Sequence, residues 1–155
     1  MRKADLFKTW ALFLIAALCS LSAFGADHGT PDEAREMVRK AVQFAKANGK
    51  EALLAEVSSS KGKFVDRDLY ISVYDFNGVV LAHGVNPKLI GKNVSSLNDV
   101  DGKFFMRDIL AQAKANGKGT TDYKWPHPET KQYQAKSAYY ESTDGMIISC
   151  GYYKY

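Results

Sequence analysis

Cysteine is scarce in this sequence, with only Cys19 and Cys150 among 155 residues. Cys19 lies in an N-terminal segment that we expect to be removed, so the mature chain keeps one cysteine and cannot form a disulfide within itself. Cys150 ends the apolar run 146–150, and no basic residue close by is expected to lower the pKa of its thiol. This pattern indicates a buried structural thiol rather than a nucleophile.

Common catalytic and metal-binding motifs are missing as well. The sequence has no GxSxG, no HExxH and no phosphate-binding glycine loop. A hydrolase that uses His83 with Asp75 or Asp122 is the weaker alternative, because it would need a nucleophile or an activated water that the sequence does not show. The three histidines, His28, His83 and His127, stand far apart, which does not fit the spacing of a metal site. We therefore expect no enzyme activity, no metal and no cofactor.

Blocks of like charge and arginine-rich patches are absent too. The full chain has 21 basic and 17 acidic residues, a net charge of +4. Residues 1–26 hold three of the basic residues and one of the acidic residues, so much of the basicity belongs to the N-terminus. We therefore expect no nucleic-acid partner.

The N-terminus has the order of a secretory signal peptide. Arg2, Lys3 and Lys8 precede the apolar run 10–18, and small residues follow up to Ala26. We predict cleavage near Ala26, which divides the chain into a signal peptide at 1–26 and one periplasmic domain at 27–155. The apolar run is short for a spanning helix, which needs about 20 residues, so an uncleaved anchor is the lesser alternative.

Three helices are predicted from their boundaries and apolar spacing. Thr30, Pro31 and Glu33 form a typical helix start, and the apolar stripe that follows predicts a long helix to about residue 47. A second, short helix is expected at 50–58 and a third at 103–115, which ends at Asn116-Gly117.

Five strands are predicted around these helices. Two lie within residues 69–83 and meet at Asn77-Gly78, where we expect a type I′ turn with positive φ at both residues. Three more are expected at about 119–125, 133–141 and 146–153. The order predicts an α+β fold: a five-stranded antiparallel sheet with a long N-terminal helix and a helical insertion between strands 2 and 3.

Strand alternation predicts one wall of a pocket. Tyr70, Ser72 and Tyr74 share one face of the first strand, and Val79, Leu81 and His83 would share a face of the second. His83 stands at a strand end beside a loop, where binding residues are often held. The alternative is a core histidine that is paired with a backbone carbonyl.

Further candidates follow on the later elements. Lys136 lies within a strand, where burial is costly unless an anion meets it; the alternative is an exposed edge lysine. Tyr123 and Trp125 share a face and serve either a pocket or a core. Arg107 could enter the cavity from the third helix or remain on the surface. The expected ligand-binding residues are His83, Lys136, Tyr70, Tyr74, Phe105, Arg107, Tyr123 and Trp125.

The chain resembles the single Cache sensor domain over nearly all of its mature length. The resemblance rests on the order of several short motifs: 73–75 with Gly78, 81–83, 86–87, 89–93, 101–105, 123–126, 136–137 and 151–153. It implies a PAS-like sheet with the long N-terminal helix behind it and a small-molecule pocket on the other face. It also implies an extracytoplasmic sensor, often of short carboxylates.

The leading hypothesis is therefore reversible binding of a small organic acid. His83 and Lys136 would supply donors to the carboxylate, with Arg107 as a further cation. Family members usually lie between two membrane spans that lead to a chemoreceptor or histidine kinase, and no such segment follows Tyr155 in this sequence. We therefore expect a stand-alone binding protein that reports to a separate membrane chemoreceptor or kinase, with weak homodimer formation through the N-terminal helix as a further expectation. The alternative is an interaction module that docks on a receptor without a ligand of its own.

Overall fold

The computed structural model describes residues 27–59 and 61–155, so the predicted signal peptide lies outside the described residues. The elements follow in this order: α1 (Pro31–Asn48), α2 (Lys50–Ser58), β1 (Val65–Asp66), β2 (Leu69–Asp75), β3 (Val80–His83), the 3₁₀ turn η1 (Pro87–Leu89), α3 (Phe105–Asn116), β4 (Lys118–Pro126), β5 (Tyr133–Thr143) and β6 (Met146–Tyr153). The predicted α+β class, the three helices and the five principal strands are confirmed. Across the described ranges, no helix is both long and apolar enough to cross a membrane.

The sheet is antiparallel throughout. β2 lies beside β6, which is followed by β5 and β4, and the other edge of β2 pairs with β1 and β3. The two-residue strand β1 is an addition to the five predicted strands. The chain therefore places its first long strand, β2, inside the sheet next to its last strand, β6.

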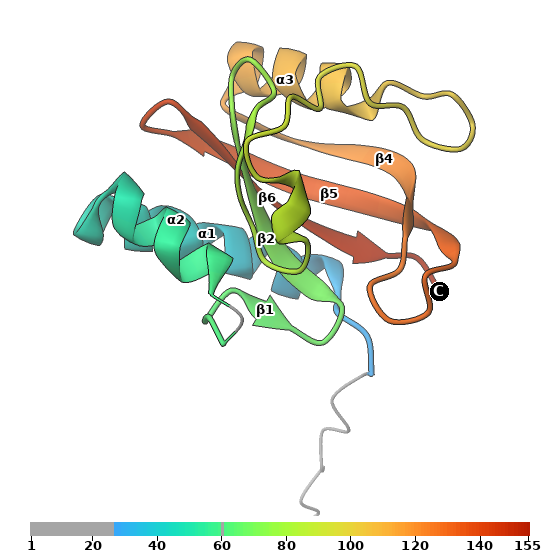
Figure 1. Cartoon of the computed structure of the whole chain (residues 1–155), viewed down its shortest axis with the longest axis horizontal. Helices are drawn as coiled ribbons and strands as arrows, with labels where there is room; N and C mark the ends of the chain where they lie inside the picture. Colours follow the sequence, from blue (N-terminus) through green and yellow to red (C-terminus); the bar gives the residue numbers. More distant parts are fainter. Residues whose placement is uncertain (1–26, 60) are drawn as a thin grey trace, which may run out of the picture.

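Helices lie on both faces of the sheet (Figure 1), and each face has its own apolar core. On one face, α1 and α2 pack on the strands through apolar residues that include Val38, Leu53, Ile71 and Ile148. On the other face, α3 and the segment that leads to it pack on Tyr140, Ile147 and neighbouring residues. The alternation of side chains along β2 and β6 thus divides each strand between two environments.

The start of α1 matches the sequence prediction in detail. The Thr30 hydroxyl accepts a hydrogen bond from the Glu33 backbone N–H, and the Glu33 carboxylate accepts one from the Thr30 N–H. This capping box satisfies backbone donors that the first helical turn leaves free, and Pro31 occupies the first helical position. The helix ends at Asn48 beside Gly49, close to the predicted boundary.

The turn between β2 and β3 differs from the prediction. Gly78 has a φ of 85°, but Asn77 does not share its positive φ, so the turn is not type I′. The Asp75 N–H donates to the Val79 carbonyl, and the Asp75 carboxylate accepts from the N–H groups of Asn77 and Val79. This side chain stabilises a three-residue loop with Gly78 in the left-handed position. The type I′ geometry is found instead at the last hairpin, where Asp144 and Gly145 have φ values of 48° and 72°.

The predicted facing of β3 is also wrong in part. Val73 pairs with Ala82 and Tyr74 pairs with Val80, so Leu81 is an extra residue with no partner on β2. This bulge places Val80 on the same face as His83, while Leu81 packs with the α1–α2 core. Simple alternation fails here because a bulge adds one residue to the count.

Candidate ligand-binding site

A small cavity lies between the sheet and the segment that carries α3. Its volume is about 30 Å³. The lining residues come from all parts of the fold: Tyr70, Ser72, Tyr74, Val80, His83, Leu89, Val94, Leu97, Phe105, Met106, Tyr123, Trp125, Lys136, Ser149 and Gly151. Seven of the eight predicted site residues are in this set, so the sequence located the wall of a real cavity.

Lys136 is the central polar group of this cavity. It is only 1% exposed, although it is a lysine in a strand. Its Nζ donates to the hydroxyl of Tyr70 at 2.8 Å and to that of Tyr153 at 3.3 Å. No carboxylate in the described ranges forms an ion pair with it, and its two hydrogen-bond partners are neutral. The alternative of an exposed edge lysine is therefore excluded.

The surroundings of Lys136 act on its charge in two ways. The rings of Tyr70 and Tyr153 face Nζ, with centroids at 4.1 and 4.4 Å, which favours the cation. Burial removes water from the ammonium and is the larger effect, so it lowers the pKa of Lys136 to about 7. A bound anion would offset this desolvation cost.

His83 presents a proton donor to the same cavity. Its Nδ1 accepts hydrogen bonds from the N–H groups of Val85 at 3.3 Å and Asn86 at 3.1 Å. These contacts assign the proton of the neutral ring to Nε2, because Nδ1 serves as the acceptor. Burial, followed by the charge of Lys136, lowers the pKa of His83 to about 4. At neutral pH His83 is thus an uncharged N–H donor.

Aromatic side chains close the other side of the cavity. Phe105 from the start of α3 stacks on Tyr123 of β4, with ring centroids 4.2 Å apart, and Trp125 meets Phe105 edge to face at 5.6 Å. The loop before α3 is held to β4 by the buried Asp99, whose carboxylate accepts from the backbone of Lys124 at 3.0 Å. The start of α3 is therefore held to β4 by the Phe105–Tyr123 stack, and the loop before it is held by Asp99.

Arg107 does not belong to this site, and its prediction as a cavity cation is wrong. The residue is exposed on α3, and its guanidinium lies over the ring of Phe104 at 4.1 Å. Helical spacing explains the difference: Phe105, Met106 and Ile109 occupy the buried face of α3, and position 107 points away from it. Lys136 is the cation that lines the cavity.

The carboxylates that a hydrolase would need lie elsewhere. Asp75 stabilises the β2–β3 loop, and Asp122, in the middle of the edge strand β4, pairs with Lys154 at 2.8 Å. Neither residue lines the cavity with His83. The geometry thus gives no support to the acid–base pairs considered for the enzyme alternative.

Sequence reasoning missed the contribution of β6 to the site. Gly151 and Ser149 line the cavity, and Tyr153 on the same strand face holds Lys136. The Tyr153 hydroxyl in turn donates to the Pro126 carbonyl at 2.8 Å. The alternation of residues 149, 151 and 153 was the available signal for this wall.

A wider depression adjoins the cavity. This outer groove has a volume of about 490 Å³ and shares Tyr70, His83 and Trp125 with the cavity. The η1 segment and the turn after β4 form its rim, including the basic residues Lys88 and Lys131. The three shared residues therefore border both spaces.

The family model for single Cache domain 2 matches residues 23–154. The chain belongs to the single Cache domain 2 family. Its fold agrees with that assignment: a methyl-accepting chemotaxis protein from Vibrio parahaemolyticus matches with a TM-score of 0.66 at 20% identity, which covers 79% of this chain and 86% of that chain.

Other relatives are larger signalling proteins that match this Cache domain over part of their length. The methyl-accepting chemotaxis protein McpP of Pseudomonas putida is 31% identical over 57% of this chain and 16% of its own length. The sensor histidine kinase MctS of Rhizobium johnstonii is 34% identical over 56% of this chain and 19% of its own length. The matched region thus spans less than a fifth of either relative, and it is homologous to sensor regions of both kinds of protein.

One solved relative is described as the structural basis for carboxylic acid recognition by a Cache chemosensory domain. It is 26% identical with a TM-score of 0.61, and the match covers 79% of this chain and 86% of that chain. Cache domains form a family of signalling modules rather than a family of enzymes.

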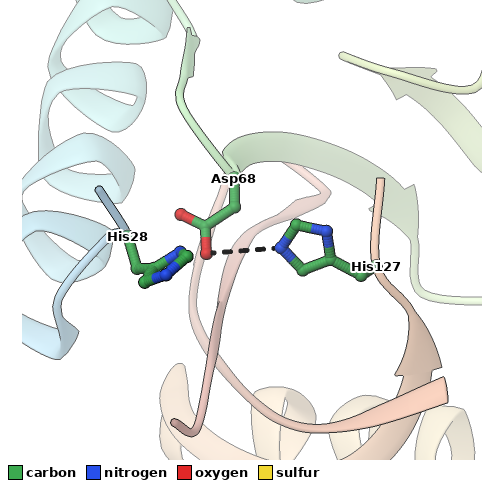
Figure 2. A group of neighbouring side chains, drawn as sticks. All are labelled: His28, Asp68 and His127. Atoms are coloured by element: carbon green, nitrogen blue, oxygen red, sulfur yellow. Dashed lines mark ion pairs between the residues drawn. The ribbon is translucent and has the colours of Figure 1, made fainter. Parts of the chain in front are cut away.

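The Cache domain also brings together two histidines that the sequence separates. Figure 2 shows His28 and His127 on either side of Asp68, and a potential ligand atom from each of the three lies within 4.8 Å of the others. The three histidines are far apart in the sequence, but His28 and His127 are neighbours in the fold. Tyr155 joins the group: its hydroxyl lies 2.9 Å from His127 Nε2 and donates to Asp68 Oδ2 at 3.0 Å.

The hydrogen bonds of this Asp68 cluster oppose metal binding. His127 Nδ1 accepts from the N–H groups of Glu129 and Thr130, so the ring proton is assigned to Nε2, the atom nearest Asp68. A metal would need the lone pair of that atom and a proton on Nδ1, where two N–H donors already point. The buried Asp68 carboxylate is instead satisfied by Tyr155 and by the Gly29 N–H at 2.6 Å.

Proposed function

We propose that this Cache domain reversibly binds a small organic acid in the periplasm and reports its occupancy to a separate signalling partner. The observation that carries this proposal is the burial of Lys136 beside the neutral donor His83, with no carboxylate of the described residues paired to the lysine. A buried cation without a counter-charge is costly, and a carboxylate ligand supplies both the charge and the acceptors.

The shape of the cavity favours a short ligand. The cavity between Lys136, His83 and the aromatic wall is about 30 Å³, close to the volume of one water molecule in the liquid, so even a short acid would extend into the outer groove that shares His83 and Trp125 with it. The ligand carboxylate would accept from Nζ of Lys136 and Nε2 of His83, and its short apolar part would contact Phe105 and Trp125. Such a ligand makes few contacts, so the affinity should be modest.

Two further features support a sensor rather than a storage protein. The relatives include a chemotaxis protein and a sensor histidine kinase, and one solved relative is described in terms of carboxylic acid recognition. We propose that a membrane protein of one of these kinds reads the bound state. Cleavage of residues 1–26, which would release a mature domain at 27–155, is part of the same proposal.

The test is a thermal-shift screen of the mature protein against acetate, propionate, pyruvate and lactate. We expect at least one acid to raise the melting temperature, and we expect Lys136→Met and His83→Ala to reduce the effect. Loss of a charge-assisted hydrogen bond should weaken binding about tenfold or more. The matched control is Lys118→Met, which removes an exposed lysine from the start of β4. An unchanged melting temperature with every acid would contradict the proposal and favour the ligand-free docking module.

A further inference from the structure

The surroundings of the Lys136 amine are suited to a nucleophile as well as to anion binding. Its polar contacts are the hydroxyls of Tyr70 and Tyr153, and both are neutral groups that can give or take a proton. The Lys136 side chain is buried, and the cavity that it lines is also lined by His83, a neutral N–H donor. A lysine that is desolvated in an apolar pocket is one of the known forms of nucleophilic amine.

The protonation state of Lys136 fits this chemistry. Because burial lowers the pKa of Lys136 to about 7, a large share of the amine is neutral at neutral pH. An ordinary exposed lysine, with a pKa near 10.4, has a neutral fraction roughly a thousandfold smaller at the same pH. The neutral form carries the lone pair that attacks a carbonyl carbon.

We propose that Lys136 captures small 2-oxo acids covalently and reversibly, as an imine between its Nζ and the carbonyl carbon of the ligand. This inference rests on the proposed binding of small organic acids in the same cavity. In a 2-oxo acid the carbonyl carbon is bonded directly to the carboxylate carbon. A ligand whose carboxylate accepts from His83 therefore brings its carbonyl group toward Lys136.

The bond changes balance without an oxidant or a reductant. The lone pair of Nζ forms the C–N bond while the carbonyl π bond breaks, and the oxygen takes a proton from the hydroxyl of Tyr70, because the proton of Tyr153 is held by the Pro126 carbonyl. The nitrogen then returns a proton to that tyrosine. The remaining C–O bond then breaks, the leaving oxygen takes the last N–H proton through the same tyrosine, and water is released as the C=N bond forms. Water addition reverses each step, so the ligand is released unchanged.

Borohydride trapping of the mature protein with pyruvate tests the inference. Reduction of the imine leaves a stable amine whose added mass is that of pyruvic acid less one oxygen atom. We expect peptide mapping of the wild-type protein to place this adduct on Lys136, at about ten times the yield found on any exposed lysine. Excess propionate, which has no ketone, should block the labelling. With pyruvate at a concentration that saturates the site at each pH, the yield should increase from about pH 6 to pH 8 as the amine loses its proton.

Two variants separate covalent capture from simple binding. Lys136→Arg keeps a cation but has no primary amine, so it should give no adduct at that position, whereas Lys118→Arg should label as the wild type does. If propionate and pyruvate stabilise the protein but the label is absent or evenly spread over exposed lysines, the imine is contradicted and the proposed function stands. If no acid stabilises the protein, the proposed function fails as well. Because the adduct is mapped on the wild-type chain, the result does not depend on how well Lys136→Arg folds.

Discussion

Gly151 and Lys136 lie so close that a Cβ atom added at position 151 would be 2.1 Å from Cε of the lysine. The two residues are on the neighbouring strands β6 and β5, where Gly151 pairs with Ala138. The buried lysine occupies the space that a side chain at position 151 would fill. Glycine at this position therefore serves the site rather than a turn.

Gly151→Ala should displace Lys136 and remove carboxylate binding. Overpacking of this kind typically lowers the free energy of unfolding by about 1–3 kcal/mol. Denaturant unfolding and thermal shift with propionate measure the two effects. The control is the pair Lys136→Ala and Lys136→Ala/Gly151→Ala: without the long side chain, the alanine at 151 should cost little. An equal cost in both backgrounds would show that the lysine is not the group displaced.

His83 should make the protein less stable as the pH falls. Its pKa is about 4 in the folded protein and near 6.5 when unfolded, so between these values the unfolded chain binds a proton that the folded chain does not. The contribution of His83 to the free energy of unfolding is complete above pH 6.5 and is lost as the pH falls to 4. Its size is on the order of 3 kcal/mol. Denaturant unfolding from pH 7 to 4.5 measures it. His83→Gln should flatten the curve, and an unchanged slope in that variant would assign the effect to other groups.

Local patterns predicted most of this architecture. Alternation identified Tyr70 and Tyr74, and the capping residues located the start of α1 at Thr30. The errors arose where a bulge interrupts strand alternation and where the sequence does not decide which face of a helix a residue occupies. Because of the bulge at Leu81, Val80 lies on the cavity side of β3. Because of helical spacing, Arg107 lies on the exposed face of α3.

The Asp68 cluster was beyond local prediction for a different reason. His28, Asp68 and His127 meet only because the segment before α1, the start of β2 and the turn after β4 converge in three dimensions. Likewise, the partners of Lys136 depend on the register between β5 and β6, which brings Tyr153 opposite it. Contacts of this kind have no signature within a short stretch of sequence.

Binding of carboxylates should weaken as the pH rises above about 7. The empty protein must take up a proton at Lys136 to present the ammonium, because burial holds the pKa of this lysine at about 7. Well above that pH, the affinity should fall by up to about tenfold per pH unit. Calorimetry with propionate from pH 6 to 9 measures the decline. Lys136→Arg, if it binds, should show little change, whereas a parallel decline in both proteins would point to another titrating group.

Zinc should leave the stability of the protein unchanged despite the proximity of His28, Asp68 and His127. The hydrogen bonds to His127 Nδ1 assign the proton to the nitrogen that a metal would need. Thermal unfolding with zinc chloride and after treatment with EDTA measures this directly. A zinc-dependent increase in melting temperature that disappears in His28→Ala would instead establish a metal site.

The Asp68 cluster should nevertheless contribute to stability. Tyr155→Phe removes the donor to the buried Asp68 carboxylate, and an unsatisfied buried acceptor costs about 1–3 kcal/mol. Denaturant unfolding of this variant measures the loss. Tyr133→Phe removes a hydroxyl from an exposed tyrosine and is the matched control. Equal stability of the two variants would contradict a structural role for the Tyr155 hydroxyl.

A crystal structure of the mature protein with propionate at about pH 6.5 tests the central claim most directly. The ligand should lie between the sheet and α3, with its carboxylate within hydrogen-bonding distance of Lys136 Nζ and His83 Nε2 and its methyl group toward Phe105 and Trp125. An empty cavity at saturating propionate, or a carboxylate bound elsewhere with Lys136 still held only by Tyr70 and Tyr153, would contradict it.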